Sequence, residues 1–289
     1  VLTELELHTN IVAWHQLAVR SWAVIRWVDV GVEYHLDRKS LERCLGPKTK
    51  IVAFTAVSNV LGTINPVRTI VDAAHRVGAR VLVDAAQSVP HGGIAAQEWD
   101  ADWIAFSGHK MLGPTGIGVL YGKREVLEDM PPFLGGGNMI HNVSREGFVP
   151  AGLPHRFEAG TAPIVEAIAM RPAVEMLVRL GAEAIVEHER GLATRAAAGL
   201  ANLPGLRLLG PTNPEHKTGI VSFVVDGIHS DQIGQWLNAA GIAIRVGHHC
   251  AMPLHARLGV GVSCRASFYI YNTESEADAF VEAVAKAIR

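Results

Sequence analysis

The feature that most constrains the fold is the alternation of short apolar runs with a helical segment across the first half of the chain. Strand-like runs occur at residues 50–55, 80–84, 103–107 and 118–121. Between the first two, residues 66–77 carry apolar side chains at helical spacing. Continuous apolar runs are typical of strands buried on both faces. The sequence therefore predicts an α/β fold with a mainly parallel sheet flanked by helices.

Composition narrows the class of protein. The chain has 289 residues, 49% of them hydrophobic, with 26 basic and 28 acidic side chains. This balance predicts a soluble globular protein, with no basic block for nucleic acid and no apolar run long enough for a membrane span. Three cysteines without a disulfide pattern favour a cytoplasmic location. Residues 1–4 look like a strand already under way, so we expect an upstream segment.

The second half of the chain is predicted to form a smaller C-terminal α/β domain. Residues 131–160 are rich in glycine and proline and are expected to form loops over a site. A long helix is expected over residues 163–203, with Glu183, Glu187, Glu189 and Arg190 on its solvent face. We expect two domains, a large one over residues 1–165 and a small one over residues 166–289.

Secondary structure in the small domain follows from the same patterns. Strands are expected at residues 219–225 and 242–246, and helices at residues 230–240 and 274–288. Ser230 and Thr273 are suitable N-caps for these two helices, because their hydroxyl oxygens can accept from free backbone N–H groups.

A lysine and an aspartate at predicted strand ends form the first candidate site. Asp84 lies in residues 83–87 (VDAAQ), and Lys110 ends residues 106–110 (FSGHK). Ligands bind outside the carboxyl ends of parallel strands, and both side chains fall there. A lysine amine can form a Schiff base with pyridoxal 5'-phosphate, while a carboxylate pairs with the protonated pyridine nitrogen. A surface lysine after a buried strand is the simpler alternative for Lys110 alone.

A cysteine among basic residues forms the second candidate site. Residues 245–251 (RVGHHCA) place Cys250 beside two histidines, and residues 264–267 (CRAS) add Arg265. Such surroundings favour the thiolate, which attacks electrophilic sulfur, and an arginine can bind a carboxylate through two hydrogen bonds. A buried cysteine or a metal site are alternatives, but the ligand spacing of a zinc site is missing, so no metal is predicted. Cys44 and Cys264 are expected to be packed.

Six blocks of sequence, in order along the chain, resemble one family. They are residues 55–62 (TAVSNVLG), 83–87 (VDAAQ), 107–110 (SGHK), 156–161 (RFEAGT), 245–251 (RVGHHCA) and 265–267 (RAS). The chain resembles the SufS-type (group II) cysteine desulfurases, also called selenocysteine lyase-like, in the class V aminotransferases. The resemblance implies the fold of type I pyridoxal phosphate transferases.

The resemblance also implies roles for individual residues around the cofactor. Lys110 would hold pyridoxal phosphate, and Asp84 would pair with its ring nitrogen. The remaining cofactor-binding residues implied are Gln87 and Asn59 at the phenolic oxygen, Ser107 and His109 at the phosphate, and Gly160 with Thr161 at the phosphate of a partner subunit. A homodimer is therefore implied.

The substrate residues follow from the same resemblance. Arg265 would bind the carboxylate of L-cysteine, with Arg245 lining the pocket and Asn59 near the substrate. Cys250 would take the sulfur, which leaves a persulfide and L-alanine. The sulfur would then pass to an acceptor protein of the SUF pathway for iron–sulfur cluster assembly.

Three positions depart from the family pattern. Leu7 stands where the family has a histidine that stacks on the cofactor, and Ala56 stands where another histidine is usual. The family's upstream Gly-Thr-Thr phosphate-binding turn is absent. His8, next to Leu7, is expected to point away if residues 5–9 are extended.

These departures keep alternatives open. A selenocysteine lyase that acts on L-selenocysteine would use the same residues. A catalytically impaired protein with this fold, which acts as a binding partner, is the alternative that Leu7 and the absent turn favour.

Overall fold

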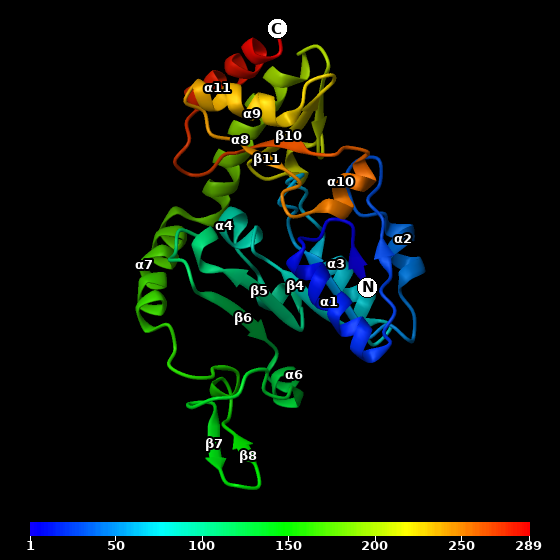
Figure 1. The fold of residues 1–289 in the computed structure, drawn as a ribbon, viewed down its shortest axis with the longest axis vertical. Helices are drawn as coiled ribbons and strands as arrows, with labels where there is room; N and C mark the ends of the chain where they lie inside the picture. Colours follow the sequence, from blue (N-terminus) through cyan, green and yellow to red (C-terminus); the bar gives the residue numbers. More distant parts are fainter.

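The computed structural model describes residues 1–289, and one of its two four-stranded sheets has the order β3-β4-β5-β6 (Figure 1). Its strands are β3 (Ile51–Thr55), β4 (Arg80–Asp84), β5 (Trp103–Ser107) and β6 (Gly118–Gly122). The first three run parallel and β6 is antiparallel to β5. The predicted α/β fold with a mainly parallel sheet is confirmed.

The helices in this half of the chain flank the sheet (Figure 1). They are α1 (Thr9–Ser21), α2 (Arg38–Cys44), α3 (Val67–His75), α4 (Ser88–Gly92), α5 (Ala96–Trp99) and α6 (Arg124–Asp129). The apolar face of α3 is buried against β4, which explains the helical spacing seen in the sequence. Buried side chains of α2, α3 and strands β3–β5 form one continuous core.

A second four-stranded sheet lies in the C-terminal part, with the order β11-β12-β10-β9 and all pairs antiparallel. Its strands are β9 (Leu206–Leu209), β10 (Ile220–Val225), β11 (Arg245–Gly247) and β12 (Ser263–Ser267). The helices α8 (Ala182–Ala201), α9 (Ser230–Ala239) and α11 (Glu274–Ala287) pack together with it around a core of their own. Cys264 is buried in this core and Cys44 in the first, as expected.

The long helix expected over residues 163–203 is two helices. They are α7 (Ile164–Leu180) and α8 (Ala182–Ala201), separated at Gly181, whose φ of 83° no helix allows. The predicted solvent face is correct for Glu183 and Glu187 but wrong for Glu189, which is buried against the other half of the molecule. Arg190, also predicted on that face, is half-buried. The division at residues 165/166 remains a prediction.

Helix caps agree with the sequence at one of two positions. Thr273 caps α11 in a reciprocal pair with Glu276, as predicted. Ser230 is not the cap of α9. His229 precedes it in an extended conformation, and its ring accepts from the backbone N–H of Asp231.

Residues 131–160 lie outside both cores, as the glycine-rich sequence predicted. They contain a short hairpin of β7 (Ile140–Val143) and β8 (Phe148–Pro150), which projects from the body of the molecule (Figure 1). The strands are mostly exposed on both faces, so the hairpin contributes little to the core.

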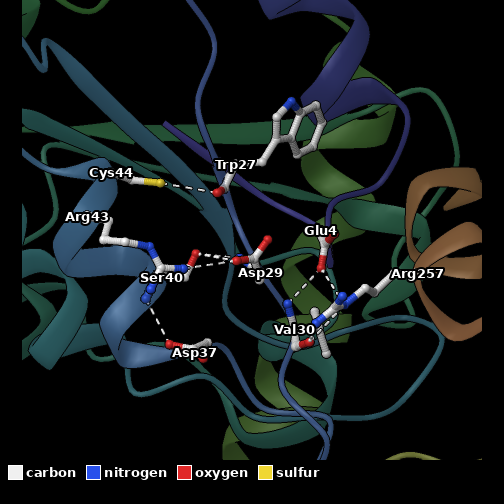
Figure 2. A network of polar contacts seen from close by, with 9 residues as sticks. All are labelled: Glu4, Trp27, Asp29, Val30, Asp37, Ser40, Arg43, Cys44 and Arg257. Atoms are coloured by element: carbon white, nitrogen blue, oxygen red, sulfur yellow. Dashed lines mark hydrogen bonds and ion pairs between the residues drawn. The ribbon is translucent and has the colours of Figure 1, made fainter.

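The first residues are tied into both parts of the molecule. Strand β1 (Leu2–Thr3) pairs in parallel with β2 (Trp27–Val28). Figure 2 shows how Arg257, on α10 (Met252–Leu258), reaches this region: it donates to the carbonyl of Val30 at 2.8 and 3.0 Å and pairs with Glu4 at 3.3 Å. The helix that follows Cys250 is therefore fixed to the N-terminal segment.

No helix in the chain combines the length and apolarity that crossing a bilayer requires.

Candidate active site

The carboxyl ends of β3, β4 and β5 lie side by side and carry the first group of candidate residues. Thr55 is opposite Asp84 in the register, and Asp84 is opposite Ala105. After Ser107 the chain makes one turn of 3-10 helix, Gly108–Lys110, which places Lys110 just beyond the strand end. A Cβ at Gly108 would come within 2.7 Å of Met170 Sδ and 2.9 Å of Ile117 Cγ2, so a larger residue at this position would displace both side chains.

Asp84 is partly buried and forms no ion pair with a cationic side chain. Its Oδ1 accepts from the backbone N–H of Ala86 at 2.9 Å. Burial raises the pKa of Asp84, while the Ala86 hydrogen bond and the charge of Lys110 oppose the rise. A protonated pyridine nitrogen would supply the missing positive charge, so Asp84 and Lys110 fit the ring and the aldehyde of pyridoxal phosphate.

A second carboxyl group lies behind this pair. Glu6 is fully buried and accepts hydrogen bonds from the side chains of Thr3 and Asn10 and from the backbone N–H of Thr55. Burial raises the pKa of Glu6 to about 8, the three hydrogen bonds oppose the rise, and the charge of Asp84 adds to it. The carboxyl at position 6 is thus electrostatically coupled to the cofactor site.

Cys250 lies on the loop between β11 and α10, at the surface of the molecule. His249 and Cys250 both adopt left-handed backbone conformations, with φ of 51° and 60°. Such conformations cost energy in residues with a side chain and occur often at functional sites. The Arg245 guanidinium donates to Cys250 Sγ at 3.7 Å, and the thiol is exposed. The loop thus presents the sulfur beside a positive charge.

The wall behind Cys250 is built from buried polar groups. Asn59 donates through Nδ2 to the carbonyl of His249 at 2.7 Å. Arg265 Nη1 donates to the carbonyl of Asn59 at 2.8 Å, and Arg265 Nε is buried without a partner. Burial, with the nearby Arg245, lowers the pKa of Arg265 to about 10. Arg265 therefore keeps free donors, as a binding group for a substrate carboxylate requires.

His249 itself is a structural residue in this wall. Burial, followed by the charge of Arg265, lowers its pKa to about 3. Its Nε2 lies 3.1 Å from both the carbonyl and the hydroxyl of Ser263, and His255 Nε2 contacts the same hydroxyl at 3.0 Å. The ring is neutral and anchors the loop to β12.

His8 contacts the Cys250 loop, contrary to the expectation that it points away. Residues 5–9 are not extended, and His8 has helical dihedral angles at the start of α1. Its backbone N–H donates to the carbonyl of Cys250 at 2.7 Å, and its Nε2 accepts from the N–H of Met252 at 3.0 Å. We call these two bonds the His8 clasp; they hold the backbone on both sides of residue 251.

The structure therefore brings the predicted residues together in two groups. Asp84 and Lys110 form one, and Asn59, Arg245, Cys250 and Arg265 form the other. Of the remaining predicted residues, Ser107 ends β5, His109 is exposed in the following turn and Gln87 precedes α4. Gly160 and Thr161 lie between β8 and α7, in the segment that follows the hairpin.

The two departures from the family pattern have different surroundings. Ala56 is buried, and its N–H donates to the carbonyl of Asp84 at 2.8 Å. Leu7 is half-buried next to Glu6. Neither side chain can transfer a proton.

Glu6 and His8 are the residues that sequence reasoning missed. The sequence signal for Glu6 is its spacing from Asn10, because residues i and i+4 can form a side-chain hydrogen bond.

The fold and the Asp84–Lys110 site define a class: a pyridoxal phosphate enzyme with an α/β fold. The family model described as "Aminotransferase class-V" matches residues 1–280. The chain belongs to this family.

Curated relatives agree with that assignment. The chain is 47% identical over 98% of its length to a probable cysteine desulfurase of Streptomyces coelicolor, covering 68% of that protein. It is 44% identical to a cysteine desulfurase of Haloferax volcanii, over 98% of this chain and 66% of the other. The chain thus spans about two thirds of the length of these relatives.

Solved structures also agree with the family assignment. The cysteine desulfurase CsdA from Escherichia coli superposes with a TM-score of 0.95 at 38% identity, covering 99% of this chain and 71% of the other. A mutant of C-DES, with glycine covalently linked to its pyridoxal phosphate cofactor, has a TM-score of 0.83 at 26% identity, covering 98% and 73%. The cofactor of this fold is therefore pyridoxal phosphate.

Proposed function

We propose that this chain is a SufS-type, group II cysteine desulfurase, which converts L-cysteine to L-alanine and leaves a persulfide on Cys250. The observation that carries the proposal is the exposed Cys250 thiol in a strained loop, 3.7 Å from the Arg245 guanidinium. The relatives named cysteine desulfurase support it.

Each group in the site has a defined task in this reaction. Pyridoxal phosphate, when bound, supplies an aldehyde that captures amines and a ring that withdraws electrons from the substrate. Lys110 holds the cofactor and moves protons at the substrate Cα, while Asp84 keeps the ring nitrogen protonated. The free donors of Arg265 bind the substrate carboxylate and orient its sulfur toward Cys250.

The sulfur transfer conserves atoms and electrons. The Cβ–S bond of the substrate breaks, and the Sγ of Cys250, as thiolate, forms an S–S bond with the departing sulfur. The electron pair of the broken bond stays on the substrate carbon, which takes up protons and leaves as alanine. A positive charge near Sγ favours the thiolate that this step needs.

The proposal extends to partners and location. The persulfide would pass to a sulfur-acceptor protein of the SUF pathway, for iron–sulfur cluster assembly in the cytoplasm. A homodimer would let Gly160 and Thr161 contact the cofactor phosphate of the partner subunit. The position of these residues after the projecting hairpin supports such a role.

Two measurements test the function: chemical labelling of Lys110 and substitution of Cys250. Borohydride reduction of the protein with pyridoxal phosphate, followed by peptide mapping, should label Lys110. Cys250→Ala should keep the visible absorbance of the bound cofactor and lose persulfide formation from L-cysteine. Cys44→Ala is the matched control, because Cys44 is buried in the core of the parallel sheet, where its Sγ donates to the carbonyl of Trp27, and its removal should not affect persulfide formation.

Other outcomes would point to the alternatives. A label at another lysine, or a Cys250→Ala protein that still forms persulfide, would contradict the proposal. Selenide release from L-selenocysteine, without sulfide release from L-cysteine, would indicate a selenocysteine lyase. Failure to bind the cofactor would leave only a non-catalytic binding protein.

A further inference from the structure

A cavity of about 280 Å³ lies beside α8, apart from the groups already described. Its polar lining consists of side chains from α8 and from the segment between β9 and β10, and its apolar wall includes four alanines of α8 and Leu208. We call it the Lys217 cavity. Its polar side chains are those of Arg190, Thr194, Thr212, Lys217 and Thr218.

Two buried side-chain polar atoms that line this cavity have no hydrogen-bond partner. Lys217 is 8% exposed and Thr218 is 6% exposed. Of the five buried side-chain polar atoms in the chain that have no hydrogen-bond partner, two line this cavity: Thr218 Oγ1 and Arg190 Nε. Buried polar groups in folded proteins almost always have partners, so such a concentration points to a ligand.

The cavity also lacks a counter-charge. None of its lining residues is acidic. The neighbour of Arg190 on the helix, Glu189, bonds instead to His91 at 2.9 Å. Burial lowers the pKa of Lys217 to about 8, and no carboxylate opposes this effect. An ammonium group without an anion is costly to hold in a partly buried site.

We propose that the Lys217 cavity binds a phosphate group, with Arg190, Lys217 and the hydroxyl of Thr218 as its donors. The three donors come from two separate elements and can serve the three free oxygens of a phosphate group, whereas a carboxylate offers only two oxygens. The apolar wall and the volume leave room for a small carbon skeleton. The ligand is either inorganic phosphate or the phosphate of a small metabolite.

The position of the cavity connects it to the loop that carries Asn59. The backbone N–H of Thr218 donates to the carbonyl of Gly62 at 3.1 Å, and Thr63 forms a bridge with Lys217. A phosphate at Lys217 would therefore stabilise the far end of the loop that supports Arg265. The site is separate from the cofactor phosphate residues, Ser107 and His109.

Calorimetric titration of the protein, already saturated with pyridoxal phosphate, tests this site with inorganic phosphate and with glycerol 3-phosphate. Lys217→Met and Arg190→Met should each weaken binding at least about tenfold, because each removes a charged donor. Arg207→Met is the matched control, since Arg207 is an exposed cation on β9 next to the cavity wall; it should change affinity less than about twofold.

Comparing the affinities for inorganic phosphate and glycerol 3-phosphate shows which kind of phosphate the cavity binds. Tighter binding of glycerol 3-phosphate identifies a phosphorylated metabolite, and equal affinity identifies inorganic phosphate; both outcomes support the site. Acetate that binds as tightly as phosphate would overturn the assignment. Binding that survives in Lys217→Met but disappears in Ser107→Ala would place the phosphate at the cofactor site and also overturn it.

Thermal unfolding gives a second, independent measurement. In phosphate-free buffer Lys217→Met should unfold at a higher temperature than the natural sequence, because an unpaired buried cation is removed. Phosphate should raise the unfolding temperature of the natural sequence and leave that of Lys217→Met unchanged. An equal rise in both proteins would contradict the proposal.

Discussion

At the scale of single residues, the carboxyl group of Glu6 shows how burial and function are linked near the cofactor. It lies within reach of the charge of Asp84 and accepts from Thr3, Asn10 and Thr55. With a pKa raised to about 8, Glu6 holds a proton in the folded protein at pH values where the unfolded chain has released it. A protonated Glu6 adds no negative charge next to Asp84.

The pH dependence of stability follows from this shift. Between pH 4.5 and about 8 the folded protein binds the Glu6 proton more tightly than the unfolded chain does. Glu6 therefore makes the free energy of unfolding decrease as pH rises through this window, by up to about 1.4 kcal/mol per pH unit. Glu6→Gln should remove that component. Urea unfolding at pH 5, 6.5 and 8 should therefore show that the free energy of unfolding decreases less with pH in Glu6→Gln than in the natural sequence.

The control for this prediction is Glu187→Gln, which changes an exposed glutamate on α8. Its stability should follow the pH dependence of the natural sequence. If Glu6→Gln does the same, the carboxyl at position 6 titrates normally.

At the scale of elements, the His8 clasp joins the start of α1 to the start of α10. The two bonds hold the backbone around Cys250 from a segment 242 positions earlier in the chain. Because His249 and Cys250 are in strained conformations, such external support is what keeps the thiol next to Arg245.

Hydrogen exchange can test the clasp without measuring turnover. His8→Ala should expose the amide of Met252 and speed its exchange by about tenfold, the effect of losing one hydrogen bond of about 1.4 kcal/mol. His8→Gln should restore protection, because its Oε1 can accept in place of Nε2. His15→Ala, on the exposed side of α1, is the control; slow exchange at Met252 in His8→Ala would refute the role of the ring.

At the scale of the whole molecule, two further polar contacts connect the first half of the chain and the C-terminal unit. His91 on α4 contacts both carboxylate oxygens of Glu189 on α8 at 2.9 Å, and Glu189 is 1% exposed. Tyr269 donates to the carbonyl of Pro90 at 3.0 Å. Since Asp84 and Lys110 lie in one half and Cys250 in the other, these contacts help to fix the geometry of the reaction.

Removing His91 should therefore destabilise the whole chain. His91→Ala leaves the buried Glu189 carboxylate without its partner, which costs about 3 kcal/mol of unfolding free energy. Urea unfolding followed by circular dichroism measures the loss. The control is His188→Ala, beside Glu189 on the same helix but exposed, and a loss equal to that of the control would rule out the contact as a link between the halves.

Local sequence patterns determined the sheet and half of the site. The apolar runs at residues 51–55, 80–84 and 103–107 are long enough to be buried on both faces, and polar residues at their ends mark the carboxyl edge. Asp84 and Lys110 could be placed by this rule alone. Thr273 could be assigned as a cap because the capping box is contained within four residues.

Tertiary packing decided the rest, because helical spacing shows which residues share a face but not what covers that face. Glu189 looks like a solvent residue in the sequence and is buried only because α4 brings His91 to it. His8 reaches the Cys250 loop, and Arg190 and Lys217 come to line one cavity, through packing between distant segments. Such contacts depend on how the helices and strands pack together, so the periodicity of the local sequence does not predict them.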